Sequence, residues 1–338
     1  MSAPLGEIDA RDMADADALK QVAALCRPVV IRGLCVDWPV ARAAAESAQA
    51  CASHLDGFDA GLSAEAFVGT ASLGGRYHYG DDLEGFNFLR EGMTVKEALR
   101  RIVANAAVPG GPTVYLGSLP GEHYFPGFAE ANPNPVLPGT VMPRIWLGNA
   151  STIACHYDMF DNLACVVAGH RRFTLFPPDA IGDLYVGPVD HTMAGQPVAL
   201  AVGAAVDDAR YPRFGAARER ALVVDLAPGD ALYLPKLWWH QVEATDPFNL
   251  LVNYWWDGFS AGPDAPYATM LLAMIAIAER PEAERAAWRA FFDHYVFRPG
   301  GGHPLAHLPE EKRGILGPLG QGNYGRIRTL VMRLLRGG

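Results

Sequence analysis

Two segments that lie far apart in the chain carry residues able to bind one metal ion. His156 and Asp158 are separated by one residue at the end of an apolar run, and His240 follows 84 positions after His156 (240 − 156). Side chains two positions apart in a β-strand point to the same face, so His156 and Asp158 can reach one ion while Tyr157 faces the other way. A turn at residues 228–230 and a short strand would bring His240 to them. The spacing therefore predicts a site of two imidazoles and one carboxylate.

This ligand set favours iron(II) over zinc. Two imidazoles and one carboxylate on one face leave three positions open on an octahedral ion, and these suit a bidentate keto acid and oxygen. Zinc sites more often recruit cysteine or a third histidine, and neither is positioned to join these residues. We therefore expect non-haem iron chemistry with His156, Asp158 and His240 as the metal ligands.

The segment that carries these ligands has the pattern of an antiparallel β-barrel or sandwich. Many short strands with turns between them are typical of these folds rather than of a doubly wound sheet. The chain also has no glycine-rich nucleotide-binding motif. Residues 181–220 form a long excursion with Pro and Gly, which we expect to lie over the barrel mouth. The short apolar runs occupy residues 113–118, 144–149, 151–158, 171–178, 221–230, 231–235 and 249–256.

The flanking segments differ in character from the barrel. The N-terminal third mixes helix and strand, and residues 94–105 have a helical period with Thr94 and Glu97 placed as a capping box. After Ser260 the pattern is helical, and one apolar stripe falls at helical spacing. That stripe consists of Trp288, Phe291, Phe292 and Tyr295. We therefore expect an α/β cap (1–110), a barrel (111–259) and a C-terminal helical region (260–338).

These motifs resemble those of the cupin-like, JmjC-type 2-oxoglutarate oxygenases, especially the branch that includes the asparaginyl hydroxylase of hypoxia-inducible factor. The resemblance extends from residues 28–39 to residues 253–258. It is densest in HYDMFDNLACVVAGHRRFTLFPP (156–178) and PGDALYLPKLWWH (228–240). It implies a mainly β fold with flanking helices, a double-stranded β-helix of the cupin (jelly-roll) type. It also implies that iron(II), 2-oxoglutarate and O2 are used to hydroxylate, or sometimes demethylate, a second substrate.

The resemblance assigns the distal carboxylate of 2-oxoglutarate to two side chains. Arg171, fifteen residues after His156, matches the basic residue that pairs with this carboxylate. The family's branch usually has lysine there, and arginine keeps the charge and adds a bidentate fork. Tyr115 matches a tyrosine that hydrogen-bonds the same carboxylate.

Three further positions are assigned in the same way. Asn162 and Asn253 match asparagines that line the metal pocket. The family often has threonine three residues before the first histidine, where this chain has Ile153. Thr152, one position further away, is then the candidate for that cosubstrate contact, and the departure predicts an altered cosubstrate pose.

The composition limits which classes of partner and which cellular compartments we expect. The net charge of −9 and the pI of about 5.6 are unusual for a protein that grips nucleic acid. The five cysteines form no C-x-x-C pair, as expected for reduced thiols in the cytoplasm. Residues 1–20 are acidic and polar, so no secretory signal is expected. The longest apolar run, residues 268–278, is shorter than the ~20 residues of a membrane span.

Two other functions compete with the oxygenase. A different metal cupin, such as a cofactor-independent dioxygenase or an isomerase, would more often show three or four histidines than a set that includes Asp158. A metal-stabilised binding scaffold would have no need for a dicarboxylate anchor such as Arg171 with Tyr115.

The resemblance also bears on the partners. It favours a polypeptide side chain as the second substrate, with a small molecule as the alternative. The helices after Ser260 resemble the dimer-forming C-terminus of relatives, so we expect a homodimer.

Overall fold

The structure is a computed structural model of the 338-residue chain. It describes residues 5–13, 16–80, 83, 85–193, 195–205, 208–257 and 264–337. The chain divides into two compact units, Met1–Asp257 and Gly258–Gly338. The boundary expected between residues 259 and 260 lies outside the described residues, and the boundary expected near residue 110 stays a prediction.

In the described residues, the larger sheet has nine strands in the order β1-β2-β12-β9-β14-β7-β6-β3-β5. Neighbouring strands are antiparallel except for β1 and β2. The strands are β1 (Gly6–Asp9), β2 (Val29–Arg32), β3 (Ser63–Gly69), β5 (Leu89–Thr94), β6 (Thr113–Pro120), β7 (Pro143–Gly148), β9 (Asp161–Ala168), β12 (Ala231–Leu234) and β14 (Asn249–Trp256).

A smaller sheet has the order β11-β10-β13-β8-β4 over the same described ranges. Its strands are β4 (Arg76–Tyr77), β8 (Ser151–His156), β10 (Arg171–Phe176), β11 (Leu222–Leu226) and β13 (Trp239–Ala244). The pairings are antiparallel except for β4 with β8. This sheet carries both predicted histidine ligands, because His156 ends β8 and His240 lies in β13.

The two sheets pack face to face around one apolar cluster. Val30, Ala164 and Leu232 come from the larger sheet, and Phe173 and Leu175 come from the smaller one. Inward and outward side chains alternate along these strands, as expected when one strand face meets another sheet. The mainly β, jelly-roll fold of the cupin type is therefore confirmed.

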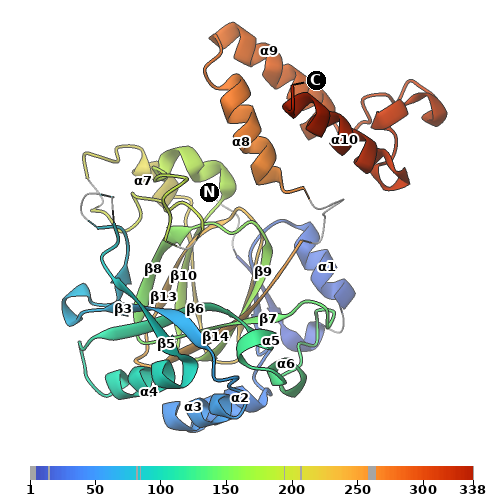
Figure 1. Cartoon of the computed structure of the whole chain (residues 1–338). Helices are drawn as coiled ribbons and strands as arrows, with labels where there is room; N and C mark the ends of the chain where they lie inside the picture. The colour runs from blue at the N-terminus through green and yellow to red at the C-terminus, as the bar shows by residue number, and fades with distance from the viewer. Residues whose placement is uncertain are drawn as a thin grey trace. The chain divides into compact units, whose positions relative to one another are not determined.

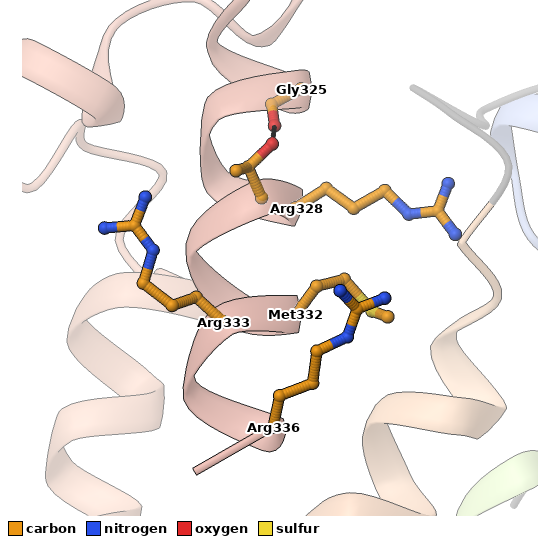
Figure 2. Close-up of a pocket in the computed structure, with 6 residues that line it drawn as sticks. Gly325, Arg328, Met332, Arg333 and Arg336 are labelled. Carbon is orange, nitrogen blue, oxygen red and sulfur yellow. Dashed lines mark hydrogen bonds between the residues drawn. The ribbon is translucent and has the colours of Figure 1, made fainter. Parts of the chain in front are cut away.

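Helices cover the outer face of the larger sheet, and Figure 1 shows α2, α3 and α4 gathered on one side of it. Thr94 Oγ1 accepts a hydrogen bond from the backbone N–H of Glu97 at 3.2 Å, which confirms the predicted N-cap of α4. The α-helices of this unit are α1 (Ala16–Ala24), α2 (Pro39–Glu46), α3 (Ala48–Asp56), α4 (Val95–Ala106), α5 (Gly121–Tyr124), α6 (Phe128–Ala131) and α7 (Phe214–Arg218).

The excursion after β10 covers the outer face of the smaller sheet. Trp239 and Phe176 point outward from that sheet and are buried beneath Leu184 and Phe214, which belong to the excursion. The expected position over the barrel mouth therefore does not describe this part of the excursion. Large apolar side chains on the outer face need a cover, and the excursion supplies it.

The second unit consists of helices whose apolar residues stay largely exposed. No residue of α8 or α9 is buried within the described chain. The predicted stripe is helical, because Trp288 to Phe292 lie in α9 and Tyr295 lies in a π-helical turn. The longer elements are α8 (Pro266–Ile277), α9 (Glu282–Phe292), the π-helical turn (Asp293–Phe297) and α10 (Asn323–Leu335).

Short 3-10 turns complete the described elements. They are η1 (Ala10–Asp12), η2 (Ala71–Leu73), η3 (Pro178–Asp183), η5 (Glu310–Lys312), η6 (Gly314–Leu316) and η7 (Leu319–Gln321). None of the helices in the described part of the chain is both long enough and apolar enough to cross a bilayer.

Candidate metal centre and active site

The three predicted metal ligands lie together between the two sheets. His156 and His240 are paired directly across β8 and β13, and their ring centroids are 4.4 Å apart. Asp158 follows β8, and its Oδ2 lies 3.7 Å from Nε2 of His240. One ligand atom from each residue lies within 4.8 Å of the others. This geometry suits three ligands of one ion, each about 2 Å from it.

Both imidazoles are held so that Nε2 is free to bind a metal. Nδ1 of His156 lies 2.8 Å from the carbonyl oxygen of Ala154, and Nδ1 of His240 lies 3.0 Å from that of Trp238. A carbonyl only accepts, so each Nδ1 carries a proton, and the neutral form of each ring then has its lone pair on Nε2. Burial lowers the pKa of His240 to about 4, which keeps its ring neutral near pH 7.

A bulge in β8 sets the direction of the ligands. His240 pairs with His156, but Val242 pairs with Ile153, so β8 has one extra residue between these pairs. Beyond the bulge, Tyr157 points away from the metal ligands and packs edge-on against the ring of Trp239 at 4.8 Å. His156 and Asp158 thus share one face, as the alternation predicts.

A chain of hydrogen bonds orients the carboxylate of Asp158. The indole N–H of Trp146 donates to Oδ1 of Asn253 at 2.6 Å, and Nδ2 of Asn253 donates to Oδ1 of Asn162 at 3.0 Å. Nδ2 of Asn162 then donates to Oδ2 of Asp158 at 3.4 Å. An indole can only donate, so it fixes the direction of the whole chain. Both predicted pocket asparagines therefore act on Asp158.

Arg171 is a buried cation without an acidic partner. It is 4% exposed, and its Nε has no hydrogen-bond partner among the described residues. Burial lowers its pKa to about 10, so the guanidinium stays charged at neutral pH. Arg171 pairs with Ala244 and Leu175 pairs with His240 on the neighbouring strand, so Arg171 faces the same side as His240. A buried, unpaired guanidinium is a receptor for an anion.

Tyr115 lies on the metal-facing side of the larger sheet. Its ring contacts those of Tyr77 and Trp146, and it is 7% exposed. Burial raises the pKa of its phenol, and the charge of Arg171 acts in the opposite direction. The phenol is therefore a neutral donor close to the Arg171 guanidinium.

Thr152 lies on the opposite face of the smaller sheet. It pairs with Glu243, and it borders a cavity of about 440 Å³ that Arg76, His78 and Gln241 also line. Because of the bulge, the residue on the metal side is Ile153. The predicted contact of Thr152 with a cosubstrate receives no support from this position, and Thr152 is left out of the function proposed below.

The residues present fit the groups that the motif implies. Two imidazoles and one oriented carboxylate are a donor set for divalent iron. The buried guanidinium of Arg171 supplies the charge that the far end of a dicarboxylate needs, and its Nε is a donor without a partner among the described residues. Sequence reasoning missed Arg144, which lies on the same inner face. Its signal was present in the alternation of RIWLG, where Ile145 and Leu147 face the helix-covered core.

The model of a protein family described as "Cupin-like domain" matches residues 15–262, which are most of the chain. The chain belongs to this cupin-like family. Among its relatives is Jumonji C domain-containing protein 5 of Drosophila melanogaster, 36% identical over 125 residues, which are 37% of this chain and 30% of that protein. The predicted JmjC-type resemblance is thereby confirmed.

Two other relatives of this chain are named for different reactions. Lysine-specific demethylase JMJ31 of Arabidopsis thaliana is 32% identical over 114 residues, 33% of this chain and 20% of that protein. Human bifunctional peptidase and (3S)-lysyl hydroxylase JMJD7 is 31% identical over 133 residues, 34% of this chain and 41% of that protein. The chain thus spans less than half the length of these relatives.

Proposed function

We propose that this cupin-like protein is an iron(II)- and 2-oxoglutarate-dependent oxygenase that hydroxylates a side chain of a protein or peptide. One observation carries the proposal: a two-histidine, one-carboxylate cluster shares the barrel interior with a buried arginine that lacks an acidic partner. A structural metal site accounts for the cluster alone. An anchored dicarboxylate accounts for both features.

In this proposal each residue has a defined task. Bound iron and 2-oxoglutarate would supply, with O2, the oxidising power that inserts oxygen into a C–H bond. His156, Asp158 and His240 hold the metal on one side and leave the other side open. Arg171 and Tyr115 fix the far carboxylate of the cosubstrate. Trp146, Asn253 and Asn162 keep the Asp158 carboxylate in its orientation, as polar supports do in metal sites generally.

The choice of hydroxylation over demethylation rests on resemblance. The relatives include a protein named as a demethylase and one named as a hydroxylase, so the family alone leaves both open. The motif order is that of the hydroxylase branch. Mass spectrometry of lysate incubated with enzyme, iron and 2-oxoglutarate tests the choice, because hydroxylation adds one oxygen atom to a product.

The proposed cofactors are tested without a known substrate. Under anaerobic conditions, 2-oxoglutarate should produce a metal-to-ligand absorption band in the iron(II)-loaded protein. His156→Ala should lose this band and keep the circular dichroism spectrum of the folded protein. Metal binding without any response to 2-oxoglutarate would instead favour a different metal cupin or a metal-stabilised scaffold.

We further propose a homodimer formed through the second unit. The segment PYATMLLAMIAI of α8 has no charged residue and no buried residue in the described chain. A groove of about 810 Å³ lies beside it, lined by Met274, Trp288 and Phe292 among others. Exposed apolar surface on this scale is typical of an interface between subunits. Residence in the cytoplasm stays a prediction.

A further inference from the structure

Arg144 lies on the inner face of the larger sheet. The same face carries the side chains whose hydrogen bonds hold the Asp158 carboxylate. It pairs with Asn253 across β7 and β14, and Trp255 pairs with Asn162 across β14 and β9. Alternation turns Ile145 into the helix-covered core and leaves Arg144 on the inner side with Trp146. Arg144 is therefore one strand pair away from the hydrogen bonds that hold Asp158.

The guanidinium of Arg144 is held in place but not neutralised. Its Nε donates to Oγ of Ser118 at 2.5 Å, and its Nη2 donates to the carbonyl oxygen of Ser118 at 2.9 Å. Its face stacks on the ring of Trp255 at 5.1 Å. Within the described ranges, no acidic residue pairs with it and no acceptor meets Nη1. Burial lowers its pKa, as expected for a cation without a counter-charge.

A second donor without a partner lies beside this guanidinium. Nε1 of Trp255 is buried and meets no hydrogen-bond acceptor in the described part of the chain. The Trp255 ring also stacks with that of Phe160, which is two residues after Asp158 and 47% exposed. The rings of Phe160 and Trp255 therefore form an aromatic path from solvent to the Arg144 guanidinium.

We propose that Arg144 and Trp255 form the recognition site for a carboxylate of the second substrate. This inference rests on the proposed function and defines its substrate class. The carboxylate belongs to an acidic side chain near the reacting position of a peptide, or to a small organic acid. Ser118 and the Trp255 ring orient the guanidinium beforehand, so that the exposed aromatic path guides the substrate to a fixed anchor beside the metal cluster.

One negative charge fits this site better than a phosphate group. The planar guanidinium matches a carboxylate with two parallel hydrogen bonds, and the Trp255 indole adds a third donor. A phosphate carries up to two charges and three oxygens, and would need another free cation. Lys236, on the turn before β13, is already paired with Asp257 at 2.6 Å, and Arg171 is assigned to the cosubstrate.

The test compares probes that differ only by a carboxylate. Full-length protein is loaded with manganese(II) instead of iron(II), which prevents turnover, and is studied with and without 2-oxoglutarate. One arm uses degenerate acetylated peptides with a central Asp or Glu against peptides with Asn or Gln. The other arm uses N-acetyl amino acids against their C-terminal amides. Enrichment by mass spectrometry scores the peptides, and quenching of tryptophan fluorescence scores the small acids.

We expect at least about a tenfold preference for the acid in one of the two arms, which identifies the source of the carboxylate. Arg144→Gln should reduce this preference to less than about twofold and leave the 2-oxoglutarate Kd unchanged. Arg144→Lys should keep part of it, because the charge remains without the fork. Arg42→Gln, at a surface position, is the control. Ser118→Ala keeps the charge but loosens its orientation, so it supplies a second measurement if Arg144→Gln does not fold.

The two proposals fail in different ways. Equal binding of acids and amides to the wild-type protein, or a preference that survives both Arg144→Gln and Ser118→Ala, would overturn the carboxylate site. Absence of any 2-oxoglutarate binding would overturn the proposed oxygenase, and the acid preference would still be scored from the samples without 2-oxoglutarate.

Discussion

Replacing Arg171 with methionine should stabilise the unliganded protein and weaken its binding of 2-oxoglutarate. Methionine keeps the length of the apolar stem and removes the buried charge. Burial lowers the pKa of Arg171 from 12.5 to about 10. One pKa unit corresponds to about 1.36 kcal/mol, so this difference of about 2.5 destabilises the folded protein by ~3 kcal/mol. Because the folded-state pKa of this base is depressed, the destabilisation is fully present at pH 7 and fades only above about pH 10.

The free energy of unfolding should therefore rise by up to ~3 kcal/mol. The rise is smaller by whatever stability is lost with the contacts that methionine does not replace. Urea unfolding of metal-free protein measures it. With 2-oxoglutarate at a hundredfold excess over the wild-type Kd, the wild-type protein should gain about 2.7 kcal/mol. The Arg171→Met variant should gain almost nothing. Arg172→Met, on the exposed side of the same strand, should change neither quantity by more than ~0.5 kcal/mol.

Two results would refute this reasoning about Arg171. The first is a variant that is less stable than the wild-type protein and still binds 2-oxoglutarate with unchanged affinity, because the arginine would then be structural. The second is equal loss of affinity in Arg172→Met, because the effect would then reflect net charge rather than the buried site.

Three further predictions concern other residues. Asn253→Leu should weaken iron(II) affinity about 10–100-fold by releasing the Asp158 carboxylate, as measured by metal titration, and an unchanged Kd would show that the hydrogen-bond chain has no effect. Thr152→Ala should leave the 2-oxoglutarate Kd within about twofold in an anaerobic titration, since Thr152 lies on the opposite face of the sheet; a large loss would contradict that placement. Ile275→Glu, at a position 85% exposed on α8, should halve the mass measured by light scattering, whereas Leu25→Glu on the other unit should not.

The metal cluster could be predicted because local rules determine most of it. Two-residue alternation places His156 with Asp158, and the strand after the turn at residues 228–230 brings His240 opposite. Thr152 was a candidate by resemblance and not by this rule, and the bulge in β8 adds a residue and turns its neighbour Ile153 inward. A bulge arises from how β8 fits β13 across the sheet, and one strand's sequence does not reveal it.

The position of the excursion after β10 was also beyond local rules. Its sequence shows Pro and Gly and a loop of unusual length, but its place depends on Trp239 and Phe176, which point outward from the smaller sheet. Neither side chain reveals its direction until the strand register is known. Arg144 was missed although the alternation of RIWLG places it on the inner face. A single arginine in an apolar run resembles an edge residue until its neighbours prove to be Asn253 and Trp255.

Arg171 and Arg144 differ from many arginines of the first unit in lying in its interior without an acidic partner among the described residues. Several arginines on its outer surface are paired with acids, as Arg172 is with Asp225 and Arg90 is with Glu65. Arg171 and Arg144, which face the space between the sheets, have no acidic partner among the described residues. Exposed pairs contribute little to stability, and a buried unpaired charge lowers it.

A fold selected for stability alone would replace these two interior arginines with apolar residues. Their presence on the face that holds His156, Asp158 and His240 is explained if bound anions neutralise their charges. Arg171 lies deep beside Tyr115, and Arg144 lies beside the half-buried Trp255 and the exposed Phe160. Two anion sites at different depths correspond to a cosubstrate that binds first and a substrate that binds over it. Wild-type protein should therefore bind the acidic probe more tightly when 2-oxoglutarate is present, and equal affinity with and without it would contradict this order.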